Sequence, residues 1–317
     1  MTETTGLALY DRTARRGSAH LIGAYSTSFG LASRLCSRDI RTHVADVYAL
    51  VRIADELVDG PAEEAGLGPA QRRALLDELE AETERAMASG YSANLVVHAF
   101  ARTARATGFG VECTRPFFAS MRRDLAPVDF ADRAEFDEYV HGSAEVVGLM
   151  CLRAFTLGMR ADPDRDARWQ RGARHLGAAF QKVNFLRDLG ADADVLGRSY
   201  FPGVDPHAIT EVQKHALLDD IDADLRIAGE VIPELPAGCR RAVAAAHALF
   251  GELAARIRRT PADGLLVARV SVPTARKLVL LARASTGRVV RPRHPNRSSR
   301  EAGATRTGAS RASGAPA

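Results

Sequence analysis

The chain carries two short acidic clusters that lie far apart in the sequence, Asp55-Glu56-Leu57-Val58-Asp59 and Asp188-Leu189-Gly190-Ala191-Asp192. Each cluster places two aspartates at positions i and i+4, which lie one above the other on the same face of a helix. Like charges at that spacing repel, so two such pairs are expected to need cations. Carboxylate oxygens on rigid helices suit Mg²⁺, which completes its shell with water and phosphate oxygens. The pattern predicts two metal-loaded helices that grip a diphosphate.

The residues around the clusters distinguish them from acidic pairs on a solvated helix surface, which is the usual reading of a lone Asp-x-x-x-Asp. Both clusters end apolar helical stretches, one beginning near Val44 and the other near Leu176. Arg52 precedes the first pair by three residues, and Arg187 is adjacent to the second. Because a guanidinium binds phosphate in a bidentate way, these arginines favour a diphosphate site.

Composition and pattern predict an all-α fold. Alanine, leucine and arginine are abundant and runs of β-branched residues are few, which favours helix. Gly and Pro punctuate the helical stretches. The expected helices cover residues 7–34, 39–60, 69–89, 93–107, 113–125, 132–159 with a break near Gly142, 163–191, 210–230, 237–258 and 273–285. We expect them to form a single-domain helical bundle around a deep apolar cavity, with the aspartates at one rim.

Several other classes of protein are disfavoured. No Gly-rich phosphate loop follows a strand pattern, which argues against a nucleotide-binding fold. No stretch of about 18 apolar residues predicts a membrane span, and the N-terminus lacks the apolar core of a signal peptide, so a cytoplasmic location is expected. The four cysteines and nine histidines are scattered, which favours buried thiols and structural imidazoles over zinc ligation.

The last 30 residues differ in composition from the rest. Residues 288–317 contain seven arginines, one glutamate and hardly any apolar side chains. Such a segment cannot form a core, so we expect a helical domain at 1–287 and a basic, disordered tail at 288–317. The alternative role for the tail is attraction to anionic lipid at the inner face of the membrane. Nucleic acid is not expected as a partner, because no aromatic residue lies between these arginines.

Five segments resemble, in order and spacing, the motifs of the squalene/phytoene synthase family. Their sequences are most similar to those of the bacterial phytoene synthases. Two are the aspartate motifs, 48–59 and 181–192. The others are the early serine-phenylalanine segment 25–29, the central helix-break segment 139–148 and the loop segment 198–202. The resemblance covers about residues 19–284 and implies the isoprenoid-synthase type of helical bundle.

The resemblance also implies roles for individual residues. The metal ligands would be Asp55, Glu56, Asp59, Asn184, Asp188 and Asp192, with Mg²⁺ as the ion and Mn²⁺ as the alternative. Arg52 and Arg187 would bind diphosphate oxygens, as would the hydroxyls of Ser26 and Ser28. Gln181, like Asn184, would contact a metal-bound water or the diphosphate. The cavity walls would include Phe29, Tyr48 and Tyr139, whose π faces stabilise a carbocation. Arg198 and Tyr200 would belong to a loop that closes over the site.

The reaction implied is the head-to-head joining of two geranylgeranyl diphosphates, in carotenoid biosynthesis. Loss of diphosphate, stabilised by the cations, gives an allylic cation, which the second substrate attacks to form a cyclopropylcarbinyl diphosphate. A second ionisation followed by proton loss gives phytoene. The departing diphosphate is the expected proton acceptor. No NADPH is expected, because no nucleotide signature is present.

Other functions remain open at this point. A C30 dehydrosqualene or squalene synthase would use farnesyl diphosphate, and the side chains that set channel depth cannot be recognised in one sequence. A non-catalytic relative acting as an assembly module would be expected to lose aspartates, yet all four are present. The Gln-x-x-Asn-x-x-Arg-Asp run argues against a terpene cyclase or a head-to-tail synthase. Expected partners are prenyl diphosphates, a membrane surface and a downstream carotenoid desaturase.

Two departures from the family pattern limit these assignments. Glu145 stands where the family often has a small residue beside the channel, unless its side chain points away. The aromatic residue that some relatives carry before the last helix is absent, and Asp263-Gly264 stand there instead. No catalytic role is therefore assigned after Pro202.

Overall fold

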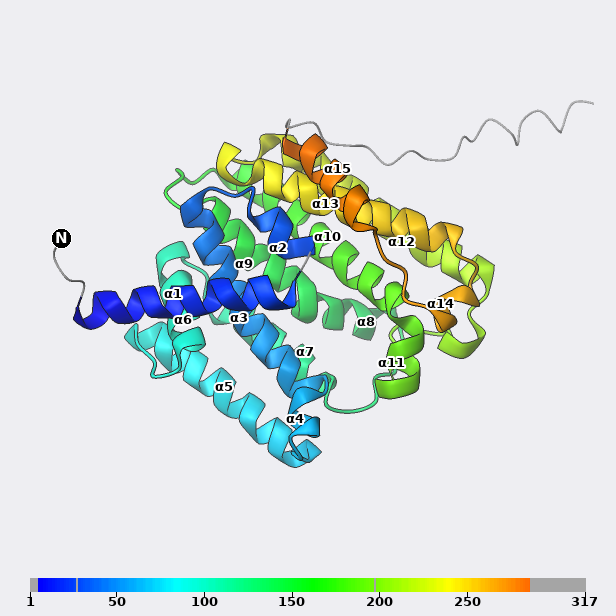
Figure 1. The fold of residues 1–317 in the computed structure, drawn as a ribbon, viewed down its shortest axis with the longest axis horizontal. Helices are drawn as coiled ribbons and strands as arrows, with labels where there is room; N and C mark the ends of the chain where they lie inside the picture. Colours follow the sequence, from blue (N-terminus) through cyan, green and yellow to red (C-terminus); the bar gives the residue numbers. More distant parts are fainter. Residues whose placement is uncertain (1–4, 27, 197, 286–317) are drawn as a thin grey trace, which may run out of the picture.

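The protein folds as an all-α bundle (Figure 1). The computed structural model describes residues 5–26, 28–196 and 198–285, in which the only β-type pairing is an isolated bridge between Asp129 and Ser199. The helices are α1 (Gly6–Tyr25), α2 (Ser28–Ser33), α3 (Arg38–Val58), α4 (Pro61–Glu64), α5 (Pro69–Ser89), α6 (Leu95–Thr107), α7 (Val111–Arg123), α8 (Arg133–Val140), α9 (Val146–Phe155), α10 (Pro163–Arg187), α11 (Leu189–Leu196), α12 (Glu211–Val231), α13 (Ala237–Arg259), α14 (Gly264–Val267) and α15 (Thr274–Ser285). The predicted fold class is confirmed.

Most helix ends follow local signals in the sequence. Asn94 caps α6 by accepting hydrogen bonds from the backbone N–H groups of Val96 and Val97. Thr210 and Gln213 form a capping box at the start of α12. Gly90, at the end of α5, has a positive φ of 86°, a conformation that glycine adopts at little cost. Such signals explain why the predicted ranges for α3, α5, α6, α12, α13 and α15 agree with the structure to within a few residues.

Two predicted helices are each divided in the structure. The range 7–34 contains α1 and α2, because the chain is extended at Ser26, whose Oγ accepts hydrogen bonds from the N–H groups of Phe29 and Gly30. The range 163–191 contains α10 and the start of α11, with Asp188 as the C-cap between them. The prediction of a continuous helix is therefore wrong at both places. The second aspartate pair consequently joins two helices.

The predicted break near Gly142 is a π-helical turn, His141–Glu145, between α8 and α9. Here the backbone passes so close to α7 that a Cβ on Gly142 would lie 2.3 Å from the carbonyl oxygen of Pro116. Only glycine fits at that separation. Within this turn, Nδ1 of His141 and Oε2 of Glu145 form a hydrogen bond of 2.9 Å.

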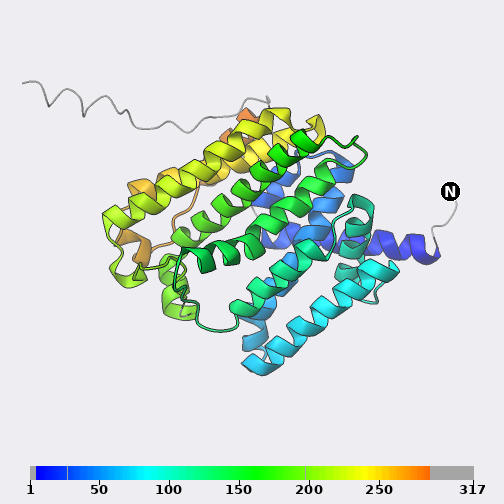
Figure 2. The same ribbon diagram turned by 180° about the vertical axis from the view of Figure 1, so that it is seen from behind.

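Helix α10 is the central element of the packing. It contacts α9 and the π turn on one side and α12 and α13 on the other, and Figure 2 shows it running beside α12. Two glycines allow the close approach to α9 and the π turn. A Cβ on Gly177 would lie 2.5 Å from the carbonyl oxygen of Ala144, and a Cβ on Gly148 would lie 2.5 Å from that of Ala173.

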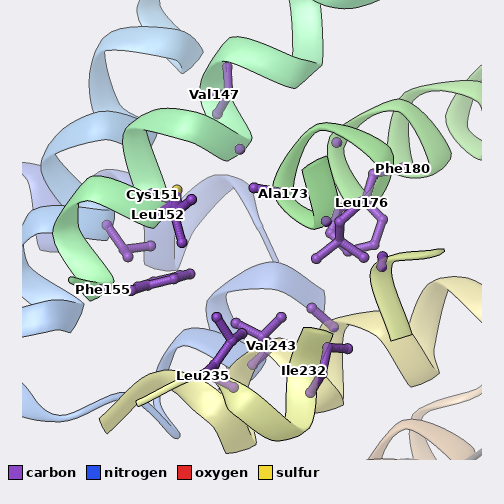
Figure 3. Close-up of a pocket in the computed structure, with 18 of the residues that line it drawn as sticks. Val147, Cys151, Leu152, Phe155, Ala173, Leu176, Phe180, Ile232, Leu235 and Val243 are labelled. Carbon is purple, nitrogen blue, oxygen red and sulfur yellow. The ribbon is translucent and has the colours of Figure 1, made fainter. Parts of the chain in front are cut away.

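An apolar cavity lies between these helices (Figure 3). Its walls come from α2, α3, α9, α10, the α12–α13 connection and α13. Phe29 and Gln181 line it, and Phe155, Trp169 and Leu235 belong to the same lining. Between Trp169 and Gln181, α10 rises about 18 Å, at about 1.5 Å per residue. The cavity is therefore long enough for an extended hydrocarbon chain.

In the described part of the chain, no helix combines the length and the apolar character needed to cross a bilayer. The predicted basic tail at 288–317 lies outside the described residues, so its disorder and its boundary stay predictions.

Replacing Gly177 with alanine tests the close helix packing. We expect Gly177→Ala to lower the free energy of unfolding by about 1–3 kcal/mol, because the new methyl group meets rigid backbone. The matched control is Gly251→Ala in α13, where no atom lies within 4 Å of the new Cβ. That change should raise stability by up to about 1 kcal/mol through helix propensity. Urea unfolding of both variants measures the difference, and equal effects would contradict the packing.

Candidate active site

The end of α3 presents the first acidic cluster and its arginine. Arg52 forms an ion pair with Glu56, and its guanidinium carbon lies 4.6 Å from the ring centroid of Tyr25. Arg52 therefore forms its ion pair with Glu56 and not with Asp55. Asp55 lies in the last turn of α3, and Asp59 is its C-cap.

The two aspartates of this cluster repel each other. Burial raises the pKa of Asp55 to about 8, with repulsion from Asp59 as the second cause. Arg52 and Arg198 act in the opposite direction without cancelling these effects. A cation bound here would reverse the balance, because it favours the ionised carboxylates.

Arg198, on the segment after α11, connects to the end of α3. Its side chain is buried and donates to Oδ1 of Asp59 at 2.7 Å. It also donates to the carbonyl oxygen of Asp124 at 2.9 Å and to the hydroxyl of Tyr200 at 3.2 Å. These bonds bring together residues 139 positions apart in the sequence.

Tyr139 and Tyr200 belong to a buried aromatic cluster behind this arginine. The hydroxyl of Tyr139 donates to Oδ1 of Asp124 at 2.7 Å. Burial raises the pKa of Tyr139. Tyr200 stacks on Phe185 with ring centroids 3.8 Å apart. Both tyrosines are about 95 % buried and pack in the core. The two tyrosines thus pack behind Arg198, the residue that bonds to Asp59, whereas Phe29 lines the apolar cavity.

Phe29 and Tyr48 form a wall between the cavity and the first cluster. Their rings stack with centroids 5.9 Å apart. Tyr48 is on α3, one turn before Arg52. Ser26 caps α2 in the same region. The side chain of Ser28 lies outside the described residues, so its predicted contact with phosphate stays a prediction.

Helix α10 carries the second set of predicted site residues on one face. Gln181 lines the cavity, Asn184 follows about one turn later and Asp188 ends the helix. The Oδ1 atom of Asn184 is buried and has no hydrogen-bond partner among the described residues. An acceptor in that position is available to a cation or to a donor on a ligand. The side chain of Asp192 lies outside the described residues.

Asp188 is held by two arginines. Arg187 donates to it, with 3.0 Å from Nε to Oδ1, and Arg269 donates from Nε to the same oxygen at 2.6 Å. Burial raises the pKa of Asp188, but the hydrogen bonds from these guanidinium groups outweigh burial and hold it below its ordinary value. The two acidic clusters, similar in sequence, therefore differ in charge state.

Sequence reasoning missed Arg269. Its guanidinium is exposed and lies at the aspartate, 81 residues away in the sequence. The only local signal was that residues 269–272, with Lys277, resemble the last helix of the family, which gave no reason to bring this side chain to Asp188. With Arg198, which pairs with Asp59, the site thus holds four arginines beside its acidic clusters: Arg52, Arg187, Arg198 and Arg269.

The donor set fits a magnesium ion in chemistry. All the candidate ligands offer oxygen, Asp55 and Asp59 repel each other, and the buried Oδ1 of Asn184 lacks a partner. Among the side chains that the structure describes, no three His, Cys, Asp or Glu groups converge closely enough to form a metal-binding cluster. The arginines instead neutralise Asp59 and Asp188.

The structure is a helical bundle with an apolar cavity, and carboxylates and guanidiniums lie at the ends of α3 and α10, two of the helices that line it. This is the isoprenoid-synthase type of fold. The chain belongs to the squalene/phytoene synthase family, whose model matches residues 22–276. It is 30% identical over 282 residues to a 15-cis-phytoene synthase of Paracoccus sp., covering 83% of this chain and 88% of that one. It is 28% identical to a phytoene synthase of Arthrospira platensis, covering 81% and 87%.

Solved structures share the fold. A dehydrosqualene synthase in complex with a ligand superposes with a TM-score of 0.72 at 24% identity, over 88% of this chain and 97% of that one. A squalene synthase from Alicyclobacillus acidocaldarius gives 0.66 at 22% identity, over 79% and 95%. The family resemblance and the fold predicted from the sequence are both confirmed.

Asp55→Asn should stabilise the metal-free protein. The folded-state pKa of about 8 exceeds the ordinary 3.8, so the proton is bound more tightly in the folded state. Asp55 therefore has no effect below pH 4, costs increasing stability as the pH rises to 8 and costs a constant amount above it. Asparagine does not ionise, so we expect a gain of about 4 kcal/mol at pH 7. Thermal unfolding in EDTA at pH 4 to 8 measures it.

The control for this experiment is Glu78→Gln, which neutralises an exposed acid on α5. Its effect should stay within about 0.5 kcal/mol at every pH. A constant or negative effect of Asp55→Asn between pH 4 and 8 would contradict the raised pKa.

Proposed function

We propose that the protein acts as a phytoene synthase, a prenyltransferase that joins two geranylgeranyl diphosphates head to head. The reaction passes through a cyclopropylcarbinyl diphosphate and releases diphosphate. Membership of the family and the likeness to the phytoene synthases of Paracoccus and Arthrospira support this function. The single structural observation that carries it is the position of Gln181, which lines the apolar cavity on the helix that ends in Asp188.

In this proposal three of the four arginines, Arg52, Arg187 and Arg269, bind the diphosphate groups. Arg52 and Arg187 lie beside the two acidic clusters, and Arg269 reaches Asp188 from the C-terminal part of the chain. Arginine is suited to this role because its planar guanidinium donates two parallel hydrogen bonds to a phosphate. Charge that develops on the departing oxygens is stabilised by groups already in place.

The aspartates would hold Mg²⁺, with Mn²⁺ as the alternative ion. The ligands would be Asp55, Asp59, Asp188 and Asp192, with Glu56 and Asn184 as further contributors. The ion supplies Lewis acidity for the leaving diphosphate. Asp55 must lose its proton before it serves as a ligand, because its pKa in the metal-free protein is about 8. Metal binding is therefore coupled to proton release.

The cavity would hold the hydrocarbon chains and exclude water. Its lining is almost entirely apolar and extends along α10 from Gln181, on the side of Asp188, to Trp169, about 18 Å away. Water must be kept out because it would add to an allylic cation. Phe29 and Tyr48 present stacked rings near the first cluster, and aromatic faces stabilise such a cation without reacting with it.

A cytoplasmic location, contact with the inner membrane surface and a downstream desaturase as partner stay predictions. No NADPH is required in the proposed reaction, because it ends in proton loss.

The direct test supplies purified protein with Mg²⁺ and either geranylgeranyl or farnesyl diphosphate, without NADPH, in detergent. We expect phytoene from the C20 substrate, identified by mass and absorbance. A C30 triene made preferentially from farnesyl diphosphate would move the proposal to dehydrosqualene synthesis. A cyclopropyl diphosphate that accumulates until NADPH is added would replace the proposed final proton loss with reduction. Failure of the folded protein to consume either substrate would contradict the catalytic function.

Arg269→Gln tests the arginine that sequence reasoning missed. Removing one cationic donor from a diphosphate site typically lowers the rate about 100-fold or more, and we expect that loss in kcat here. The variant should also shift the acidic limb of the pH profile upward, since Asp188 loses a hydrogen bond that lowers its pKa. The control is Arg276→Gln, which removes a nearby arginine that pairs with Glu252 at 2.8 Å. Equal rates for the two variants would remove Arg269 from the site.

A further inference from the structure

A second hollow, of about 1020 Å³, lies between α1, α2 and α3, outside the residues assigned to the active site apart from Ser26. Figure 1 shows these three helices side by side, and α1 packs on α3 and α6. Seven arginines line the hollow: Arg102, which pairs with Asp11, and six others, Arg12, Arg15, Arg16, Arg34, Arg38 and Arg41. We call this hollow the basic groove.

The basic groove has far more positive than negative charge. Two acidic residues line it, Asp11 and Asp39. Asp11 is already paired with Arg102 and bonds to Nε2 of His98 at 2.8 Å. Among the lining acids, Asp39 is therefore the one left to face these six arginines, and Arg15 is also attracted to the buried carboxylate of Asp46. Within the described part of the chain, none of the six forms an ion pair or a side-chain hydrogen bond.

Exposed arginines without a partner among the described residues also occur singly, as Arg73 and Arg85 do on α5, but in the groove they gather around one hollow. Elsewhere on the protein surface, Arg115 pairs with Glu84, Arg122 with Asp77 and Arg133 with Asp137. These three surface arginines each lie next to an acidic side chain that neutralises them. The groove instead gathers unpaired guanidinium groups from three separate elements.

The arrangement is unfavourable without an anion. Arg12 lies three and four residues before Arg15 and Arg16 on α1, and like charges at that spacing repel. Nε of Arg15 is buried and has no hydrogen-bond partner in the described structure, although buried donors are usually satisfied. A bound anion would relieve both costs.

The floor of the groove is apolar, which indicates the rest of the ligand. Ile22, Leu31 and Ala45 lie between the arginines. Helix α2 separates the groove from the apolar cavity: Phe29 lines the cavity, Leu31 lines the groove and Ser33 lines both. A ligand with an anionic head and an apolar chain matches both kinds of surface.

We propose that the basic groove is a second anion-binding site, which takes the phosphate group of an amphiphile at the outer side of α2. The guanidinium groups bind the phosphate or diphosphate, and the apolar floor contacts the chain. Two sources carry this chemistry, a free prenyl diphosphate and the headgroup of a membrane phospholipid. The site is independent of the aspartates and does not require the ion proposed there.

The test compares two double variants of the full-length protein in EDTA. Arg12→Gln/Arg38→Gln removes one exposed arginine from each side of the groove. The control, Arg73→Gln/Arg85→Gln, removes two exposed arginines of α5 and leaves the groove unchanged. Both variants lose the same charge and keep the basic tail, so a difference between them reports on the groove. Thermal unfolding checks that both are folded.

Two probes distinguish the sources. The first is sedimentation with vesicles of phosphatidylcholine, with and without phosphatidylglycerol. The second is calorimetric titration with farnesyl thiodiphosphate. We expect the groove variant to bind one of these probes at least about tenfold more weakly than wild type, with the control within about twofold. Loss in the vesicle assay alone identifies phospholipid, and loss in the titration alone identifies prenyl diphosphate.

Two results would overturn the proposal. One is a wild-type protein that binds neither probe, and the other is an equal loss of binding in the groove and control variants. Because EDTA prevents turnover, these results do not depend on the proposed synthase reaction. Hydrocarbon formation with Mg²⁺ in detergent is measured separately, so failure of that function would be recognised by itself.

Discussion

The buried guanidinium of Arg198 connects the parts of the molecule that form the active site. A buried charge without partners costs several kcal/mol, so its hydrogen bonds hold it in place strongly. It bonds to Asp59 at the end of α3, to the carbonyl oxygen of Asp124 after α7 and to the hydroxyl of Tyr200. These bonds fix the segment after α11 against the end of α3. The stacking of Tyr200 on Phe185 extends the connection to α10.

This connection explains why the two acidic clusters have different charge states. Arg198 approaches Asp59 and Arg52 pairs with Glu56, so Asp55 is left buried beside a charged neighbour and its pKa rises. Asp188 instead receives Arg187 and Arg269, and its pKa falls. In the metal-free protein the first cluster therefore holds a proton that a cation must displace. The carboxylate of Asp188 in the second cluster is already ionised, so it needs only to exchange its contacts with Arg187 and Arg269 before it can bind a cation.

Local sequence signals predicted most of the helices but not all of their ends. Apolar periodicity located α6, although the predicted range 93–107 included its cap, Asn94, and Gly90 marked the end of α5. The interruptions at Ser26 and Asp188 were missed because the apolar pattern continues through both. A serine or aspartate that ends a helix cannot be told from sequence alone from a serine or aspartate on the surface of a continuing helix.

The site was predictable where its residues are local and unpredictable where they come from distant segments. The two clusters and Arg52 and Arg187 were found because helix geometry relates residues three to four positions apart. The approaches of Arg198 to Asp59 and of Arg269 to Asp188 depend on tertiary packing, over 139 and 81 residues. No local pattern encodes such a contact. The close passage of the π turn past Pro116 was likewise visible in the sequence only as a break near Gly142.

Helix α2 has a special position, because it is short and has chemically different surroundings on its two sides. On the inner side, Phe29 faces the apolar cavity and stacks on Tyr48, which leads to the first acidic cluster. On the outer side, Leu31 and Arg34 face the basic groove. A prenyl diphosphate has the same two chemistries joined by one bond. An amphiphile whose head is held in the groove would therefore have its chain next to α2, the helix that Ser26 caps and that also lines the cavity.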